Sequence, residues 1–446
     1  MRVIDGTTIT AMNSPEIARR PLASGMVHRQ AEITASLLRY AAGHVALGRP
    51  VDAELTRQFR AHREWGARDR RLLNKAVFGY FRWKGWIDRL AGDDWAARAA
   101  LSLWFETTPE EERPAVADVL AEQGRLAPAW RRPLGGLALA ARAEVLAAGG
   151  GICRPEWLVP EWLPAELVGT SGVVGAFIEA IQTRPPTWLR VRCGVESAVL
   201  DALRNLGIAA ETDIRVAAAI RVPGSCDLNA LRRCVGAAFE VQDIASQCVG
   251  LIAAPAAGER WWDACAASGG KSLHLADLAR GALHILATDI REATRTELQR
   301  RVRAAGLTCI QVGLHDATQS PPAAGAFDGV LVDAPCSGIG TWSRNPDARW
   351  RLPADAVARL AVTQQAILRQ AARAVRPGGR IVYAVCTLAR RETDDVIGSF
   401  LAEHPDFALA VARHPLTGQS TTGSLAIWPQ EGPGDGMFIA NLRRCG

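Results

Sequence analysis

Hydrophobic positions recur with a helical period through the first third of the chain. Apolar residues fall three or four positions apart in AEITASLLRYAAGHVALG and again in DRRLLNKAVFGYFRW, with no strand-like alternation between these segments. This pattern predicts an all-helical domain over residues 28–145. Residues 1–27 lack such a period, and we expect them to form a loose tail.

A different pattern follows three consecutive glycines at residues 149–151. The proline- and tryptophan-rich stretch CRPEWLVPEWLP that comes next is typical of a domain boundary. Strand-like, helical and strand-like periods then succeed one another in TWLRVRC, ESAVLDALRNLG and AAETDIRVAAAIRV, and this group ends near AFEVQD. We therefore expect a small α+β unit over residues 152–242.

From residue 243 to residue 446, apolar strand-like runs alternate with helical segments. The first unit, RWWDACAASGGKSLHLADLA, predicts a strand over 260–265, a loop of small residues over 266–270 and a helix over 271–280. Four further strands are expected in ALHILATD, LTCIQVGLHDA, FDGVLVDAPCSG and GGRIVYAVCTL. Such alternation predicts an α/β domain with a parallel sheet that is covered by helices on both faces.

Polar and nucleophilic side chains stand at the carboxyl ends of these successive strands. They are Cys265, Asp289, Asp316, Asp333, Cys336 and Cys386. An aspartate after a strand is more often a turn former or a helix cap than a ligand, but the ends of parallel strands share one crevice, where ligands bind. The coincidence of these residues therefore favours a functional site. Asp328 opens its strand at the opposite edge, and we interpret it as structural.

The loop of small residues has the properties of a nucleotide-binding turn. Its glycines let a ligand approach the backbone, and the helix that follows offers free N–H groups at its N-terminus. Asp289 stands twenty positions after Gly269, where an acid grips ribose hydroxyls in a nucleotide-binding sheet. The loop is not a Walker A motif, because Cys265 occupies a position that requires glycine. A P-loop-like nucleotide hydrolase is the alternative that this loop leaves open.

A chain of 446 residues is long enough for two or three domains. Because 48% of the residues are apolar and 22% are charged, we expect these domains to be folded around a hydrophobic core. The first twenty residues lack the apolar core of a signal peptide, and the most apolar later stretch is interrupted by Arg142 and Glu144, so we expect no membrane span. Ten cysteines occur without CxxC pairs or His/Cys clusters, which predicts neither a metal site nor a disulfide framework. We expect a cytoplasmic protein, and we take it to be a monomer.

Positive charge is concentrated between Arg57 and Arg89. This segment holds ten Lys or Arg residues against three acids, whereas the whole chain has a net charge of only +6. Seven aromatic residues are interleaved with the charges, and the mixture suits RNA because cations bind phosphates and aromatic faces stack on bases. The alternative is a pair of amphipathic helices with core aromatics and solvated arginines. The segment alone does not decide between the two.

Four blocks of the sequence resemble the signature motifs of a known protein family. DACAASGGKS, DAPCSGIGTWSRNPDARW, YAVCTLARRETDDVI and GDGMFIANLRR are similar to the signature blocks of the Sun/nucleolar-protein family of RNA 5-methylcytosine methyltransferases. The resemblance covers roughly residues 155–446, while residues 28–145 resemble, more weakly, the NusB-type RNA-binding domain of the bacterial ribosomal-RNA members. The sequence departs from the family pattern at Ser268, where proline is usual, and at Val385 and Thr387 beside Cys386.

The resemblance implies a Rossmann-like S-adenosylmethionine methyltransferase sheet that acts on carbon 5 of a cytosine in RNA, with ribosomal RNA as the expected substrate. It implies that Cys386 is the nucleophile, that Asp333 faces the ring nitrogen and that Cys336 helps to release the product. It also makes residues 152–242 an RNA-binding subdomain. The implied cofactor-binding residues are Cys265, Ala266, Ala267, Ser268, Gly269, Gly270, Lys271, Asp289, Asp316 and Asp333, with a supporting role for Arg295.

The chemistry of cytosine explains why two cysteines and a carboxylate are needed together. Carbon 5 is a poor nucleophile, but a thiolate that adds to carbon 6 turns the ring into an enamine that can accept a methyl group. DNA cytosine methyltransferases place this thiolate in a Pro-Cys pair, which here would be Pro335-Cys336, but their Glu-Asn-Val block is missing from this chain. A non-catalytic RNA-binding or assembly factor with the same fold remains the alternative function.

Overall fold

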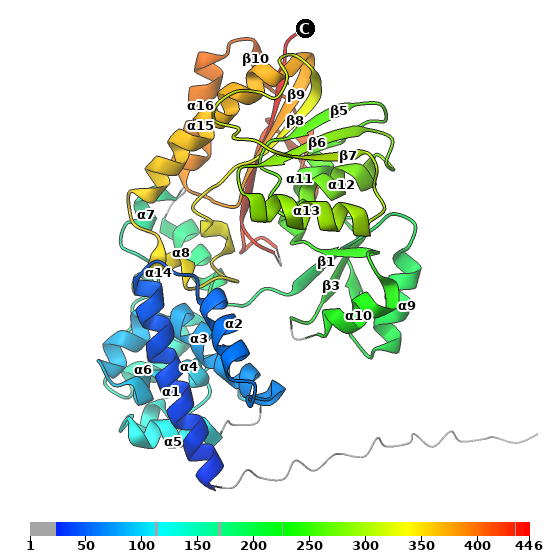
Figure 1. Ribbon diagram of the computed structural model, residues 1–446. Helices are drawn as coiled ribbons and strands as arrows, with labels where there is room; N and C mark the ends of the chain where they lie inside the picture. The colour runs from blue at the N-terminus through cyan, green and yellow to red at the C-terminus, as the bar shows by residue number, and fades with distance from the viewer. Residues whose placement is uncertain (1–23, 112–114, 168–170, 225, 433) are drawn as a thin grey trace, which may run out of the picture.

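Residues 24–446 are described by the computed structural model, apart from residues 112–114, 168–170, 225 and 433. The chain folds into a helical domain, a small α+β unit and a larger α/β domain (Figure 1). Residues 1–23 of the expected tail lie outside the described residues. The first helix begins at Ser24, four residues before the helical period of the sequence.

Amphipathic helices form the first domain, as their period predicts. They are α1 (Ser24–Ala46), α2 (Val51–Ala61), α3 (Ala67–Ala91), α4 (Trp95–Glu106), α5 (Ala115–Gln123) and α6 (Leu139–Ala147), with the 3-10 turn η1 (Pro128–Trp130). Helix α4 is buried along most of its length, and it packs against α1, α3 and α5. The apolar stripes of the surrounding helices are buried against it, which is what stabilises helices of this length.

The helical core continues beyond the boundary expected at residue 152. The next elements are η2 (Pro155–Leu158), α7 (Leu163–Glu166) and α8 (Ser171–Ala180). Leu163, Phe177 and Ile181 are buried in the same cluster as the residues of α3 and α4. The strands of the α+β unit therefore begin at Thr187 rather than near residue 152, because the helical domain covers the apolar faces of these short helices.

The α+β unit is a four-stranded antiparallel sheet with the order β2-β3-β1-β4. Its elements are β1 (Thr187–Val191), α9 (Glu196–Asn205), β2 (Glu211–Thr212), β3 (Ala219–Val222), α10 (Leu228–Val235) and β4 (Phe239–Val241). The expected strand AAETDIRVAAAIRV is split into β2 and β3, because Asp213 accepts hydrogen bonds from the backbone N–H groups of Arg215 and Val216 and turns the chain.

The α/β domain contains the expected sheet. Its strands are β5 (Arg260–Asp263), β6 (His284–Asp289), β7 (Ile310–Leu314), β8 (Phe327–Asp333), β9 (Val375–Val385), β10 (Phe407–Leu409), β13 (Ser424–Ile427) and β14 (Met437–Arg444). The order is β10-β14-β9-β8-β5-β6-β7, and β13 pairs with β14. Strands β5 to β9 are parallel, as the alternation predicts, whereas β14 runs antiparallel to β9, so the sheet is mixed rather than parallel throughout.

Helices cover both faces of this sheet, as the alternating pattern predicts. Helices α11 (Ile244–Ala253), α12 (Gly270–Leu278) and α13 (Glu292–Ala304) pack on one face, and α15 (Ala356–Ala374) and α16 (Asp394–Glu403) pack on the other (Figure 1). The remaining short elements are η3 (Ile339–Thr341), α14 (Ala348–Arg351), η4 (Arg390–Glu392), β11 (Ala412–Arg413) and β12 (Ser420–Thr421).

The helical domain is docked on the α/β domain through the segment that follows Cys336. Asp347 accepts a hydrogen bond from the backbone N–H of Val51 at the start of α2, at 3.1 Å. The indole Nε1 of Trp350 donates to the carbonyl of Phe81 in α3, at 2.7 Å. The block TWSRNPDARW therefore joins the two domains, and it places the helical domain close to the loop that carries Cys336.

A fully buried arginine lies at the centre of this junction. The guanidinium of Arg349 donates to the backbone carbonyls of Leu158, Ile181 and Trp342. Its acceptors are thus neutral oxygens from both domains, and burial holds the pKa of Arg349 well below its ordinary value. A cation that depends on carbonyls from separate segments is satisfied only when those segments are assembled.

The aromatic residues of the basic segment belong mostly to the core. Tyr80, Phe81, Trp83 and Trp86 are each at most 1% exposed, so they cannot stack on RNA bases, and that part of the RNA interpretation is wrong for them. Several arginines of the same segment are exposed; they are Arg57, Arg60, Arg63, Arg68, Arg71 and Arg89. The segment therefore presents a basic surface to solvent, while its aromatic side chains are part of the hydrophobic core.

The packing of α3 against η2 within the helical domain leaves no room for a side chain at one position. A Cβ atom on Gly85 of α3 would lie 1.6 Å from the carbonyl oxygen of Trp157. Because that neighbour is backbone, Gly85→Ala should lower the free energy of unfolding by about 1–3 kcal/mol. Gly43→Ala in α1, where a Cβ would meet none of the described atoms within 4 Å, is the matched control and should unfold at the wild-type temperature or above. Thermal unfolding checks both, and equal melting temperatures for the two variants would contradict the close packing at Gly85.

Candidate active site

The expected crevice lies where the winding of the sheet changes direction. From the central strand β5 the chain builds outward through β6 and β7 on one side, and through β8 and β9 on the other. The loops after β5 and β8 leave the sheet side by side, because these strands are parallel neighbours. Such a switch point is where open α/β sheets bind ligands.

The two cysteines of the sequence blocks are in contact. The Sγ atoms of Cys336 and Cys386 are 3.3 Å apart, and both residues are partly exposed. The hydrogen bond to Cys386, together with burial, raises the pKa of Cys336 well above its ordinary value. Cys336 therefore keeps its proton and can donate it to the sulfur of Cys386.

An ion pair lies next to the cysteines. The ammonium of Lys271, in the first turn of α12, is 2.6 Å from Oδ2 of Asp333 at the end of β8. Burial disfavours the charge on Lys271, but the carboxylate of Asp333 and the sulfur of Cys386 together raise its pKa, so the lysine stays cationic. A cation in this place stabilises negative charge on a neighbouring sulfur. The charges of Lys271 and Cys386 interact although the two residues are distant in the sequence, so the sequence alone does not indicate this interaction.

The loop of small residues has the shape that a nucleotide requires. Gly269 precedes α12 in the left-handed region with φ of +86°, and a Cβ there would lie 2.0 Å from Cδ1 of Leu298. Ala267 also has a positive φ of 46°. Gly270 faces open space at the helix N-terminus, since a Cβ atom there would meet none of the described atoms within 4 Å. A backbone cradle of this kind fits the anionic or polar end of a cofactor.

A buried carboxylate that sequence reasoning missed binds the helix that follows the small-residue loop. Asp263, at the end of β5, is fully buried and accepts a hydrogen bond of 2.5 Å from Oγ of Ser272 in α12. Burial, and to a lesser degree the neighbouring charge of Asp333, raises the pKa of Asp263 to about 7. Its position at the end of a predicted strand, two residues before Cys265, was the available signal. The side chain of Cys265 lies nearby, and burial raises the pKa of its thiol.

Asp289 ties the end of β6 to the same loop. One carboxylate oxygen accepts from the backbone N–H of Ala267 at 3.0 Å, and the other accepts from the backbone N–H of Arg291 at 2.9 Å. Burial opposes the charge, but these bonds and the guanidinium of Arg291 lower the pKa of Asp289. Asp289 and the small-residue loop are thus brought together, as their spacing predicts.

Ser268 connects the loop to the α+β unit. Arg301 in α13 donates to the hydroxyl of Ser268 at 2.8 Å and to the carboxylate of Glu240 in β4 at 2.6 Å. A proline at position 268 could not make the hydroxyl contact. No sequence pattern indicates this contact, because the three residues belong to different elements.

Within the part of the chain that the structure describes, the candidates Asp316 and Arg295 have hydrogen-bond partners only in their own segments of the chain. Asp316 lies two residues beyond β7 and accepts hydrogen bonds from the N–H and hydroxyl of Thr318, which is the arrangement of a turn former. Arg295 in α13 pairs with Glu292 one turn earlier and does not contact the cysteines. Asp328 accepts from the backbone N–H of Arg260 at the opposite edge of the sheet, in keeping with a structural role.

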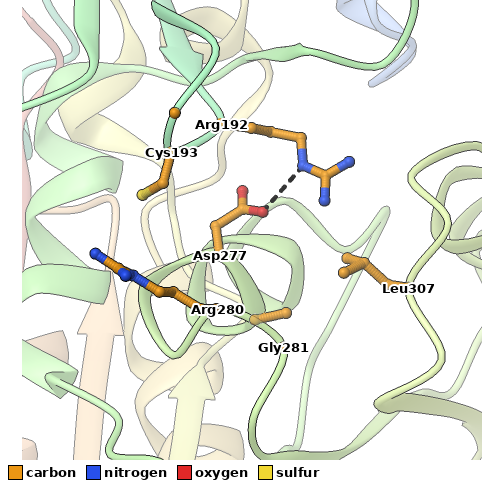
Figure 2. A pocket seen from close by; sticks show the side chains of 8 residues that line it. Arg192, Cys193, Asp277, Arg280, Gly281 and Leu307 are labelled. Atoms are coloured by element: carbon orange, nitrogen blue, oxygen red, sulfur yellow. Dashed lines mark hydrogen bonds and ion pairs between the residues drawn. The ribbon is translucent and has the colours of Figure 1, made fainter.

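A separate cavity of about 450 Å³ lies between the α+β unit and the α/β domain (Figure 2). In Figure 2 the guanidinium of Arg192 pairs with the carboxylate of Asp277, at 3.2 Å. Arg280 and Gly281 precede β6, and Leu307 precedes β7, so this cavity is at the amino ends of the strands. It is therefore distinct from the crevice that holds the two cysteines.

Over the described residues, His, Cys, Asp and Glu side chains form no group of three or more that could hold a metal ion. Among the helices that the structure describes, none is long and apolar enough to cross a membrane.

A family model and individual relatives both indicate a ribosomal RNA methyltransferase. Residues 250–443 match the model of the family described as 16S rRNA methyltransferase RsmB/F. A probable ribosomal RNA small subunit methyltransferase B of Bacillus subtilis is 32% identical over 301 residues, which cover 66% of this chain and 67% of the relative. The corresponding protein of Sodalis glossinidius is 32% identical over 289 residues, covering 64% and 65%. The chain thus spans about two thirds of the length of these relatives.

Solved structures agree with this comparison. The crystal structure of PH0851 has a TM-score of 0.71 and 25% identity, and the match covers 92% of this chain and 99% of that one. NSun6 from Pyrococcus horikoshii, solved with SFG, shares the fold with a TM-score of 0.53 at 14% identity, over 62% of this chain and 96% of that one. With its sheet, its paired cysteines and these relatives, the chain belongs to the 16S rRNA methyltransferase RsmB/F family.

Proposed function

We propose that the protein transfers a methyl group from S-adenosylmethionine to carbon 5 of a cytosine in ribosomal RNA, through a covalent bond between a cysteine and carbon 6. Membership of the family makes the chain an RNA methyltransferase that uses S-adenosylmethionine, and it removes the P-loop-like hydrolase as an alternative. The observation that carries the finer proposal is the contact of 3.3 Å between the sulfurs of Cys336 and Cys386. Two thiols beside one ion pair suit the making and breaking of a bond to the base.

The small-residue loop is proposed to hold the cofactor. When bound, S-adenosylmethionine supplies an electrophilic methyl group. The backbone from Cys265 to Lys271 would lie along the cofactor, and Asp289 would accept from the ribose hydroxyls. The side chain of Arg291 is 64% exposed, so it can move away from Asp289 without disturbing the core. Asp316 would lie at the adenine edge, and Asp333 would border the pocket.

The two cysteines take different parts in the proposed reaction. Cys386 adds to carbon 6 as the thiolate, which makes carbon 5 nucleophilic. Cys336 keeps its proton in the free protein, since its pKa is raised by the hydrogen bond to Cys386 and by burial. It can therefore give that proton to the sulfur of Cys386 as the bond to carbon 6 breaks, and the sulfur of Cys336 takes up the proton that leaves carbon 5, so that the double bond between carbons 5 and 6 is restored.

The Lys271–Asp333 pair supplies the electrostatic part of the proposal. Negative charge builds on ring nitrogen 3 when the thiolate adds, and a proton that passes from the ammonium of Lys271 to Asp333 would be delivered there. The ammonium of Lys271 is 2.6 Å from Asp333 and holds the carboxyl group in place. Its charge also favours the thiolate form of a neighbouring cysteine.

RNA would reach this crevice as an unpaired or flipped-out base, because the reacting atoms of a stacked base are inaccessible. The exposed arginines of the basic segment are proposed to bind phosphates, and the α+β unit is proposed to be a second RNA-binding element. In Figure 1 the helical domain and the α+β unit lie on the same side of the α/β domain, an arrangement that suits one RNA in contact with both.

The roles of the cysteines predict opposite behaviour for two variants. Cys386→Ala should neither methylate RNA nor form a covalent adduct, because no bond to carbon 6 can form. Cys336→Ala should still add to the base and transfer the methyl group, but it should remain attached to its substrate. A denaturing gel with labelled RNA and S-adenosylmethionine measures the adduct, and the double variant is the control that should lose it. Adducts from Cys386→Ala but not from Cys336→Ala would reverse the assignment.

The cofactor assignment predicts that Asp289→Ala weakens S-adenosylmethionine binding by at least about tenfold, which corresponds to about 1.4 kcal/mol. The variant loses the ribose contact and also the hydrogen bond that holds Ala267. Isothermal titration measures the affinity. Asp328→Asn at the opposite edge of the sheet is the matched control and should bind normally. An unchanged affinity in folded Asp289→Ala would remove this residue from the cofactor site.

The basic surface predicts a change in the salt dependence of RNA binding. Reversing the charge of the exposed residues Arg68 and Arg71 should weaken binding and flatten the plot of log affinity against log salt, because fewer counterions are released. Affinity for S-adenosylmethionine should stay unchanged. Reversal of Arg373, an exposed residue of α15, serves as the control. If the salt slopes of wild type and the double variant coincide, these arginines are merely solvated.

A further inference from the structure

A buried carboxylate lies beneath the two cysteine loops. Glu392, in η4 (Arg390–Glu392), has 0% of its surface exposed. The backbone N–H of Ser337 donates to its Oε1 at 2.9 Å, the hydroxyl of Ser337 donates to its Oε2, and Nε2 of Gln364 donates to Oε1 at 2.9 Å. Burial raises the pKa of Glu392, although these hydrogen bonds oppose the shift. A carboxylate in such a place is costly unless its neighbours satisfy it, so its bonds constrain the surrounding backbone.

These bonds hold both neighbours of Cys336. Ser337 follows Cys336 directly and is bound to Glu392 through both its backbone and its side chain. Pro335 precedes Cys336, and its carbonyl accepts from the same Nε2 of Gln364 at 3.0 Å. Glu392 and Gln364 therefore fix the backbone on either side of the cysteine.

The same network reaches the second cysteine. The hydroxyls of Ser337 and Thr387 are 2.8 Å apart, and Thr387 follows Cys386 directly. Glu392 itself is anchored to the sheet, because the hydroxyl of Tyr383 in β9 donates to its carbonyl at 2.7 Å. One carboxylate thus joins two loops that are separated by about fifty residues of chain.

Glu392 cannot touch the RNA base, since it is fully buried below the loops. We propose that Glu392, supported by Gln364, is a positioning residue for the methyl-transfer reaction, which sets the placement of Cys336 against Cys386. This inference rests on the proposed covalent function. The side chain acts through Ser337 and Thr387, and it takes no part in the bonds that are made and broken.

The network predicts which step depends on Glu392. Cys386 follows β9, which is held between β8 and β14 by the sheet, so the nucleophile stays in place without Glu392. Cys336 lies in a loop, and the loop loses its hydrogen-bond acceptor when the carboxylate is removed. Addition to the base should therefore continue, while release of the methylated product should slow.

Three variants and a control test the inference with ribosomal RNA and S-adenosylmethionine. We expect Glu392→Ala to lower kcat by about tenfold or more, to leave KM for S-adenosylmethionine within about twofold, and to accumulate a covalent protein–RNA species. Glu392→Gln keeps the shape and an acceptor for Ser337, and it should recover most of the turnover. Glu403→Ala, an exposed acid near the end of α16, should behave as wild type. Ser337→Ala removes only the hydroxyl between Glu392 and Thr387, and it should also slow release.

Each outcome decides one point. Wild-type turnover in Glu392→Ala, or slow turnover without accumulated adduct, would overturn the positioning role. If Glu392→Ala does not fold, Ser337→Ala carries the test, and normal release in that variant would overturn the inference. If the wild-type protein itself neither methylates the RNA nor forms an adduct, the proposed function fails, and that result is distinguishable from a failure confined to the Glu392 and Ser337 variants.

Discussion

The contact between Cys336 and Cys386 depends on the parallel pairing of β8 with β9. Asp333, the last residue of β8, lies opposite Ala384 of β9, so the two strands end at the same level and their loops leave the sheet together. The backbone N–H of Gly340 also donates to the carbonyl of Cys386, at 3.0 Å. Residues that are distant in sequence thus come within 3.3 Å, and the chemistry of the site rests on this register.

Three charged side chains surround this contact, namely Lys271, Asp333 and Glu392. The Lys271–Asp333 pair lies at the carboxyl ends of β5 and β8, next to the small-residue loop, and the buried carboxylate of Glu392 is bound to Ser337, which follows Cys336. The hydrogen bond to Cys386 and burial raise the pKa of Cys336, and the charge of Glu392 adds a smaller contribution in the same direction. Two chemically identical side chains therefore lie in different electrostatic surroundings, as a reaction with separate addition and release steps requires.

The sequence was sufficient to predict the α/β sheet, the helical domain and the loop between β5 and α12, because these depend on local periodicity and on glycine. It could not predict that Lys271 lies beside Cys386, or that Glu392 joins Ser337 to Thr387, since such contacts arise from strand order. The aromatic residues Tyr80 and Trp83 show that a local pattern can also indicate a role that the fold rules out. Their composition suggested stacking on RNA, but a buried stripe on α3 has the same sequence pattern.

The central claim is that Cys386 and not Cys336 forms the bond to the base. Incubation with S-adenosylmethionine and RNA that contains 5-fluorocytosine should trap the enzyme, because fluorine at carbon 5 cannot leave as the proton does and the covalent bond persists. Peptide mapping of the trapped protein by mass spectrometry then identifies the attached residue. We predict a modified peptide that contains Cys386, with Cys336 unmodified. A modification at Cys336, or a methylated product without any trapped protein, would contradict the account.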